Sequence, residues 1–282
     1  MPIAYDSSRA ALYTPERRET LFAHGQTYTP LQLAIEAARL AYYRIETSAL
    51  ELQRLTEALA RVGFGKPSLF LHAPTGSEAF ASVRVADGTA LIAFRGTQPG
   101  ALRDLFTDAR ANLTPWPESA GCVHAGFAAG ARALLPEIRE WLGRTDHDAS
   151  RTIVAGHSLG AALATLAASV ISSGTLVTLG SPRVGDRTFA ATVTLPSTHV
   201  VGCCDGVTEV PPALAGYAHV TPRTYLTRHA EPLTDPPAHV VRADRRHAHW
   251  QYTLEHAWRK GAVLLRSFAD HAPINYARAF WP

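Results

Sequence analysis

The sequence predicts an α/β fold with a mostly parallel central sheet and helices on both faces of the sheet. Short continuous apolar runs, at 152–155 and 175–179, alternate with segments of helical apolar spacing, at 125–142 and 159–171. Such an alternation is typical of parallel strands buried beneath helices. No composition shift or flexible linker divides the chain, so we expect residues 1–282 to form a single domain.

The elements follow in order from the N-terminus. Residues 1–66 are predicted to form a surface strap followed by two helices within 30–61, as a helical extension of the fold. A strand at 80–85, the turn Asp87-Gly88 and a strand at 90–94 then predict a hairpin. A further short apolar run at 199–202 predicts another buried strand.

Composition limits the class of protein. The chain is 46% hydrophobic and 18% charged, and its net charge of +3 gives no reason to expect a nucleic-acid partner. The longest apolar stretch, 161–171, is far shorter than the roughly 20 residues of a membrane span. Three cysteines do not form a disulfide framework, and residues 1–6 do not resemble a signal peptide. We therefore expect a cytoplasmic protein, with export by a route without a cleaved signal left open.

The most informative motif is Gly156-His157-Ser158-Leu159-Gly160, which matches G-x-S-x-G. An apolar strand precedes it and an Ala/Leu-rich helix follows, as this nucleophile turn requires. The flanking glycines leave room in a sharp turn that exposes the Ser158 hydroxyl, and the Leu159 amide comes at a helix N-terminus that favours negative charge. The alternative is an ordinary Gly-rich turn. His157 is expected to pack or hydrogen-bond rather than act as the base, because adjacent side chains diverge at such a turn.

Companion motifs accompany this turn in a fixed order. They are Phe94-Arg95-Gly96-Thr97, His124-Ala-Gly126-Phe127, Gly156–Gly160, Gly180-Ser-Pro182-Arg183-Val-Gly185-Asp186, Asp205-Gly-Val-Thr-Glu-Val-Pro211-Pro212, and Asp270-His271 ahead of Tyr276. The series resembles the class 3 lipases, the family of the filamentous-fungal triacylglycerol lipases, from about Leu69 to the C-terminus. The resemblance implies an α/β-hydrolase fold and a Ser–Asp–His catalytic triad.

By this resemblance, Asp205 is the acid and His271 is the base of the triad that activates Ser158. The base would accept the serine proton, and the carboxylate would orient and stabilise the imidazole. Asp186 is a rival for the acid, although the family has a structural turn there.

Several other histidines are weaker candidates for the base. His124 matches a family histidine with a structural role, and His219 lies in a segment that resembles a strand. His247 and His249 are expected to be solvated, because no carboxylate or thiolate at a recognisable spacing completes a metal site.

Two further features concern the substrate. The Leu159 amide and, by resemblance, Thr97 would form the oxyanion hole, although Thr97 could also cap the following helix. Residues 98–110 carry an apolar stripe that includes Leu102, Leu105 and Phe106. The family has an amphipathic lid at this place, while an ordinary surface helix would give the same pattern.

The sequence therefore predicts a serine carboxylic-ester hydrolase, a lipase or esterase, acting on acylglycerols or similar lipid esters, with transient binding to a lipid interface. No metal or organic cofactor is expected. Two alternatives remain open at this point. One is a phospholipase A-type acyl hydrolase, and the other is a catalytically silent interaction module with the same fold.

Overall fold

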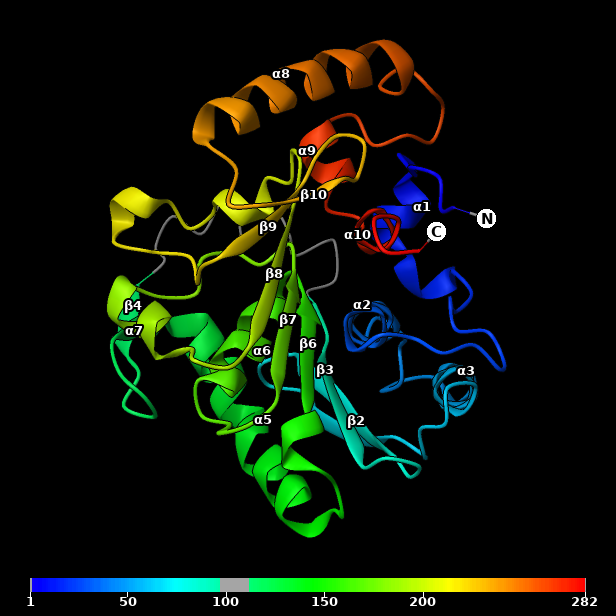
Figure 1. The fold of residues 1–282 in the computed structure, drawn as a ribbon, viewed down its shortest axis with the longest axis vertical. Helices are drawn as coiled ribbons and strands as arrows, with labels where there is room; N and C mark the ends of the chain where they lie inside the picture. Colours follow the sequence, from blue (N-terminus) through cyan, green and yellow to red (C-terminus); the bar gives the residue numbers. More distant parts are fainter. Residues whose placement is uncertain (1, 97–111, 282) are drawn as a thin grey trace.

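The computed structural model describes residues 2–96 and 112–281. Its centre is an eight-stranded sheet in the spatial order β1-β2-β3-β6-β7-β8-β9-β10 (Figure 1). The strands are β1 (Ser68–His72), β2 (Ser77–Arg84), β3 (Thr89–Phe94), β6 (Ile153–His157), β7 (Thr175–Leu179), β8 (Ser197–Gly202), β9 (Arg223–Leu226) and β10 (Pro232–Thr234). The five strands from β3 to β9 in this order run parallel, and antiparallel partners complete both edges. The predicted α/β-hydrolase class, with a mostly parallel sheet, is confirmed.

A separate two-stranded sheet pairs β4 (Leu113–Pro115) with β5 (Cys122–His124). The predicted hairpin is the antiparallel pair β2–β3, in which Phe80 lies opposite Ala93. Its turn contains Gly88 at φ +67°, a backbone conformation that glycine adopts at little cost. The strands β9 and β10 occupy a region for which the sequence pattern predicted no strand.

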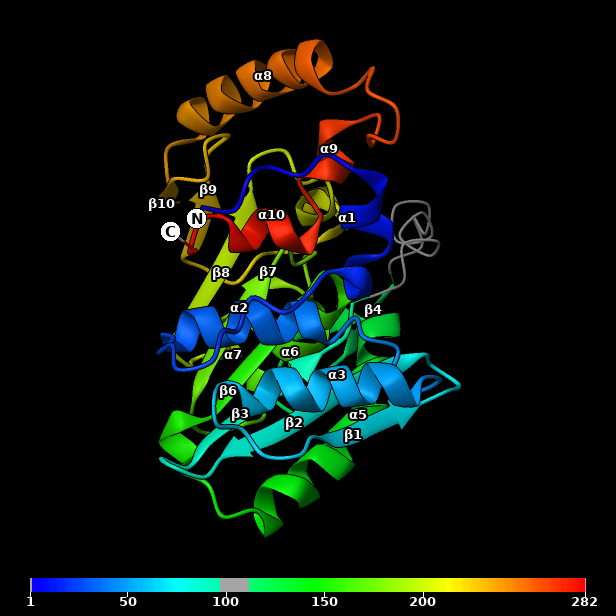
Figure 2. The same ribbon diagram turned by 90° about the vertical axis from the view of Figure 1, so that its right-hand side faces the viewer.

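Helices cover both faces of the large sheet (Figures 1 and 2). They are α1 (Arg9–Tyr13), α2 (Pro30–Leu40), α3 (Ala49–Ala60), α5 (Ala125–Arg144), α6 (Leu159–Ala168), α7 (Arg187–Thr192), α8 (Ala238–Glu255), α9 (Arg266–Ala269) and α10 (Pro273–Ala277). One apolar core lies between the sheet and α5, α6 and α7, and the other lies between the sheet and α2, α3 and α10. Successive strand residues Ile153 and Val154 point into opposite cores, as the pleat of a strand requires.

The N-terminal helices are a layer of the fold rather than an appendage to it. In α2, Leu33, Ile35 and Leu40 are buried against the sheet. The helix begins with a capping box in which Thr29 and Gln32 exchange side-chain and backbone hydrogen bonds, so two amide groups of its first turn are satisfied. Residues 1–66 were expected to extend the fold, whereas α2 covers the middle of one sheet face.

No helix within the described residues is both long enough and apolar enough to cross a membrane.

The stability of the fold should fall in mild acid. His199 is buried in β8, where its Nδ1 lies 2.8 Å from the Thr178 hydroxyl, and burial lowers its pKa to about 4. An unfolded histidine titrates near pH 6.5, so the unfolded state gains a proton first as the pH falls. His199 therefore favours folding above about pH 6.5, and up to about 3 kcal/mol of stability is lost by about pH 4.

Denaturant unfolding at pH 7 and pH 4.5 measures this loss, with His199→Gln as the comparison. The variant should lose less stability than the wild type between the two pH values. Equal losses would contradict the assignment to His199.

Candidate active site

Ser158 lies in the sharp turn between β6 and α6. Its backbone has φ 59° and ψ −128°, which is strained for a residue with a side chain and costs about 1–3 kcal/mol. Both glycines of the motif are required by close packing. A Cβ on Gly156 would lie 2.2 Å from the carbonyl oxygen of Gly160, and one on Gly160 would lie 2.2 Å from that of Phe94. The local sequence thus permits a turn that other residues would prevent.

The structure brings Ser158, His271 and Asp205 together from three separate segments. The Nε2 atom of His271 lies 2.9 Å from Ser158 Oγ, and its Nδ1 atom lies 2.7 Å from Asp205 Oδ2. All three side chains are buried. Because an ionised carboxylate only accepts hydrogen bonds, Nδ1 carries the proton and Nε2 is free to accept one from the serine. This arrangement can deprotonate a serine hydroxyl.

Two other groups fix the Asp205 carboxylate. The Tyr276 hydroxyl donates to Oδ2, and the Val207 amide donates to Oδ1 at 2.8 Å. Tyr276 in turn accepts a 3.0 Å hydrogen bond from the Gly202 amide. Burial, followed by the charge of Asp205, raises the pKa of Tyr276 well above its usual value, so the hydroxyl stays neutral and donates. The carboxylate is held in one orientation towards His271.

His157 forms a hydrogen bond to the backbone of His271, the proposed base. Its Nε2 lies 2.9 Å from the backbone oxygen of His271, and its Nδ1 lies 2.7 Å from the Tyr42 hydroxyl. Since a carbonyl only accepts, Nε2 is the protonated nitrogen and Nδ1 accepts from Tyr42. Burial, and then the proximity of His271, lowers the pKa of His157 far below its usual value. His157 is therefore a neutral hydrogen-bonding residue, and sequence reasoning missed its partner Tyr42.

Part of the predicted oxyanion hole is described. Leu159 is the first residue of α6, so its amide belongs to the helical turn whose N–H groups have no acceptor within the helix. Gly96 approaches the site closely, because a Cβ there would lie 2.0 Å from the Tyr42 hydroxyl oxygen. Thr97 and the candidate lid residues Leu102, Leu105 and Phe106 lie outside the described residues.

The rival candidates have structural partners. Asp186 caps α7 by accepting from the Phe189 amide at 2.8 Å, and it also accepts from the Cys122 amide at 3.0 Å. His124 caps α5 and accepts from the Gly126 amide at 3.1 Å. The ring of His219 lies 2.8 Å from the carbonyl oxygen of Thr208.

The pair His247 and His249 is exposed on α8, as expected for a solvated run.

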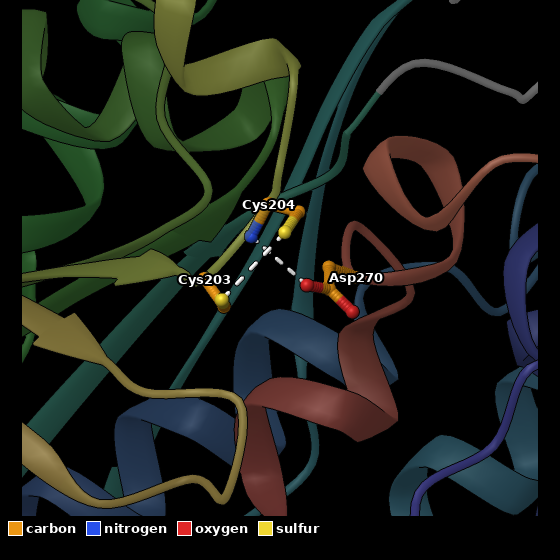
Figure 3. A group of neighbouring side chains, drawn as sticks. All are labelled: Cys203, Cys204 and Asp270. Carbon is orange, nitrogen blue, oxygen red and sulfur yellow. Dashed lines mark hydrogen bonds between the residues drawn. The ribbon is translucent and has the colours of Figure 1, made fainter. Parts of the chain in front are cut away.

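One buried group has the composition of a metal site. Donor atoms of Cys203, Cys204 and Asp270 lie within 4.8 Å of one another (Figure 3). The Asp270 carboxylate, however, already accepts from the Tyr5 hydroxyl at 2.7 Å, the Cys204 amide at 2.9 Å and Arg266 Nε at 3.1 Å. A metal ion would have to displace the buried guanidinium. These residues instead form hydrogen bonds that join the segment carrying Asp205 to the segment carrying His271.

Gly180→Ala should impair the site although it replaces none of the proposed catalytic residues. Gly180 has φ +57°, and a Cβ there would lie 2.7 Å from Asp205 Oδ2 and 2.9 Å from the Tyr276 hydroxyl oxygen. Displacement of the carboxylate by even about 1 Å is expected to lower kcat/KM about 100-fold.

Steady-state kinetics on a soluble ester would measure this loss. Gly76→Ala is the matched control, because Gly76 has φ +63° and open space around the added Cβ. Equal activities of the two variants would contradict the close approach at Gly180.

A strained strand–serine–helix turn on a parallel sheet, joined to a buried histidine and aspartate, defines an α/β-hydrolase with a Ser–His–Asp constellation. Residues 91–215 match the model of the family described as lipase (class 3). Over this segment the chain is similar to the class 3 lipases, and the match confirms the resemblance predicted from the motif series.

Relatives with sequence similarity are fungal lipases. A secreted mono- and diacylglycerol lipase 1 from Fusarium solani is 36% identical over a 117-residue alignment that covers 38% of this chain and 35% of the relative. A Rhizopus niveus lipase is 34% identical over 46% of this chain and 37% of its own length. A secreted mono- and diacylglycerol lipase A from Penicillium cyclopium is 28% identical over 54% and 53%. The chain thus spans between about a third and a half of these relatives.

Solved structures show the same fold. A lipase from Rhizopus microsporus var. chinensis superimposes with a TM-score of 0.59 at 24% identity, covering 80% of this chain and 83% of that one. A Rhizomucor miehei lipase propeptide complex gives a TM-score of 0.58 at 20% identity, covering 83% and 84%. At these identities the likeness establishes the fold alone.

The relatives contradict the predicted cytoplasmic location. Two of them are named as secreted lipases, which points to an extracellular rather than a cytoplasmic protein. The prediction depends on residues 1–6 and on an odd number of cysteines. An odd number shows only that at least one thiol lacks a partner within the chain, which is compatible with either compartment.

Proposed function

We propose that this chain is a serine carboxylic-ester hydrolase that cleaves acylglycerols or similar lipid esters through an acyl-enzyme on Ser158. The observation that carries the proposal is the pair of hydrogen bonds that connects Ser158 Oγ to His271 at 2.9 Å and His271 to Asp205 at 2.7 Å. Such a buried, fully connected series activates a serine as a nucleophile. The fungal relatives named as lipases support the same function.

In the proposed mechanism, His271 Nε2 accepts the proton of Ser158 as Oγ attacks the ester carbonyl. Asp205 stabilises the imidazolium that forms and holds its tautomer. The Leu159 amide donates to the carbonyl oxygen as it becomes negative, and Thr97 supplies a second donor by resemblance. His271 then returns the proton to the leaving alcohol. Water, activated by the same histidine, releases the fatty acid and restores Ser158.

The proposed substrate class is the acylglycerols. Two relatives are named for mono- and diacylglycerols, and they supply the argument for a glycerol ester over a phospholipid. Comparison of emulsified diacylglycerol with phosphatidylcholine vesicles as substrates would separate the two. Faster release of fatty acid from the phospholipid would contradict the acylglycerol assignment.

We also propose that the chain acts as a single catalytic domain. The N-terminal helices and α10 share one apolar core with the sheet, which supports this view. Residues 98–110 remain the candidate lid.

Hydrolysis of p-nitrophenyl esters from acetate to palmitate tests the proposed activity. We expect turnover by the wild-type protein, with a preference for longer acyl chains if the enzyme is a lipase. A folded protein that hydrolyses none of the esters, soluble or emulsified, would contradict the proposed function and favour the silent interaction module.

A further inference from the structure

The helix α8 has one buried face and one exposed face. Asp244, Ala248 and Tyr252, spaced four residues apart, are its buried residues. At about 100° per residue, Arg246 and Trp250 lie on the opposite side of the helix. Figures 1 and 2 show α8 lying across one end of the molecule, with α9 beneath it. Among the elements that the structure describes, none lies over its outward side in either view.

Large apolar side chains form a stripe on this outward side. Trp250 is 69% exposed, Leu254 is 55% exposed and Trp258 is 73% exposed. Their spacing of four residues places them in one row along the helix and its end. The indole Nε1 of Trp258 donates to the carbonyl oxygen of Leu254 at 2.7 Å, which keeps Trp258 next to the helix. We call Trp250, Leu254 and Trp258 the α8 stripe.

Positive charges accompany the α8 stripe. Exposed cations on the helix and the turn after it are Arg242, Arg246, Arg259 and Lys260. The acidic Asp244 faces inward and pairs with Arg228, and Glu255 is the other acidic residue of the segment 238–260. The Arg259 guanidinium lies 6.0 Å from the centre of the Trp258 ring. The outward side of α8 therefore combines apolar rings with a net positive charge.

The inward side of α8 is bonded to both loops of the candidate active site. Arg245 Nε donates to the carbonyl oxygen of Cys203 at 2.7 Å, two residues before Asp205. Arg266 joins α8 to the segment that leads to His271, since its Nη1 donates to the carbonyl oxygen of Ala248 at 3.1 Å. Figure 3 shows Cys203 and Cys204 next to Asp270, where these two segments meet. A lipid surface or protein bound to the α8 stripe would therefore lie against the helix that is bonded to the segments carrying Asp205 and His271.

We propose that the α8 stripe is a docking surface for a lipid–water interface that carries negative charge. The proposal rests on the proposed function, because an acylglycerol hydrolase must reach esters gathered in such an interface. Tryptophan and leucine enter the boundary between head groups and acyl chains, while arginine and lysine bind anionic head groups. The helix binds in the plane of the interface and does not cross it.

Vesicle co-sedimentation tests the docking surface without requiring turnover. Every protein carries Ser158→Ala, so that the vesicles are not hydrolysed. The vesicles contain phosphatidylcholine alone or phosphatidylcholine with phosphatidylglycerol. We expect binding to be stronger to the anionic vesicles and to fall as salt is raised. A blue shift of tryptophan emission should accompany binding.

Matched variants locate the surface. Leu254→Ser should weaken binding about tenfold by removing apolar area from the contact. Leu50→Ser is its control, because Leu50 is 64% exposed on α3, away from α8 in Figure 1. Arg246→Gln should weaken binding to anionic vesicles about fivefold. Its control is Arg139→Gln, which removes an exposed arginine from α5.

The proposal would be overturned by a protein that sediments with neither kind of vesicle, or by equal losses in Leu254→Ser and Leu50→Ser. A stable dimer in solution that Leu254→Ser converts to monomer, without vesicle binding by either, would assign the stripe to self-association instead. If the wild-type protein binds vesicles but hydrolyses no ester, the proposed function would be contradicted. The docking surface would still be supported by the binding.

Discussion

Replacing Ser158 by alanine should lower kcat for ester hydrolysis by about 10⁴- to 10⁶-fold. The alanine lacks the oxygen that forms the acyl-enzyme, and the His271 imidazole is left without the proton donor that lies 2.9 Å away. Alanine also has to adopt the left-handed backbone of residue 158, as serine does, so the strain of the turn is similar in both proteins. Residual rate would come from substrate binding and the oxyanion donors.

The measurement is kcat and KM on a soluble p-nitrophenyl ester, with circular dichroism to establish that the variant is folded. KM should change far less than kcat, because the serine acts on the reaction rather than on ground-state binding. A folded Ser158→Ala protein with more than about a tenth of wild-type kcat would contradict the assignment of the nucleophile.

Asp205→Asn should lower kcat by about 10⁴-fold, the second largest expected effect. Asparagine has nearly the same shape, but its carboxamide lacks the charge that stabilises the His271 imidazolium. Both carboxylate oxygens accept hydrogen bonds, Oδ2 from His271 and Tyr276 and Oδ1 from the Val207 amide, so the NH2 group of asparagine must face a donor on one side. If the amide nitrogen turns to His271 instead, the imidazole must present its other tautomer, and Nε2 can no longer accept the serine proton.

Asp186→Asn is the matched control for this prediction. Asp186 was the rival for the acid, and it caps α7 and binds the Cys122 amide. Its replacement should cost about 1–3 kcal/mol of stability, because asparagine can still cap the helix but leaves one of the two amides without its acceptor, and turnover should change only a few-fold. Thermal unfolding and kcat of both variants test the pair. Near-normal turnover in Asp205→Asn, or a large loss in Asp186→Asn, would reverse the assignment of the acid.

The sequence predicted the sheet well because its strands are buried on both faces. Runs such as 175–179 are mainly apolar and β-branched, which marks them as buried strands, and β7 has these bounds. The nucleophile turn was equally readable. Gly156 and Gly160 are required by contacts within the motif itself or with the adjacent strand β3, so local sequence carries the information.

The contribution of α2 and Tyr42 to the site could not be predicted from local sequence. The spacing of α2 predicts a helix with one apolar face, but periodicity does not say which surface that face covers. Tyr42 follows this helix and reaches His157 across 115 positions of the chain. Nothing local to Tyr42 signals that contact. Tyr276 was part of the motif series, whereas its role as a donor to Asp205 became visible only in the fold.

The region 223–256 shows a further limit. The region is rich in arginine and histidine and we predicted no strand or helix in it, yet it forms β9, β10 and the long helix α8. The strands β9 and β10 are short and contain polar residues, so they lack the continuous apolar run that identified the central strands. The apolar residues of α8 are divided between an inward row and the outward α8 stripe, which weakens the signal of a single buried face.

Labelling with a fluorophosphonate probe tests the central claim most directly, because it reports an activated serine without any choice of substrate. We expect one covalent adduct, located by peptide mass spectrometry on Ser158. We also expect the adduct to be lost in Ser158→Ala and to form far more slowly in His271→Ala. A folded wild-type protein that takes up no probe, or takes it up at another serine, would contradict the central claim.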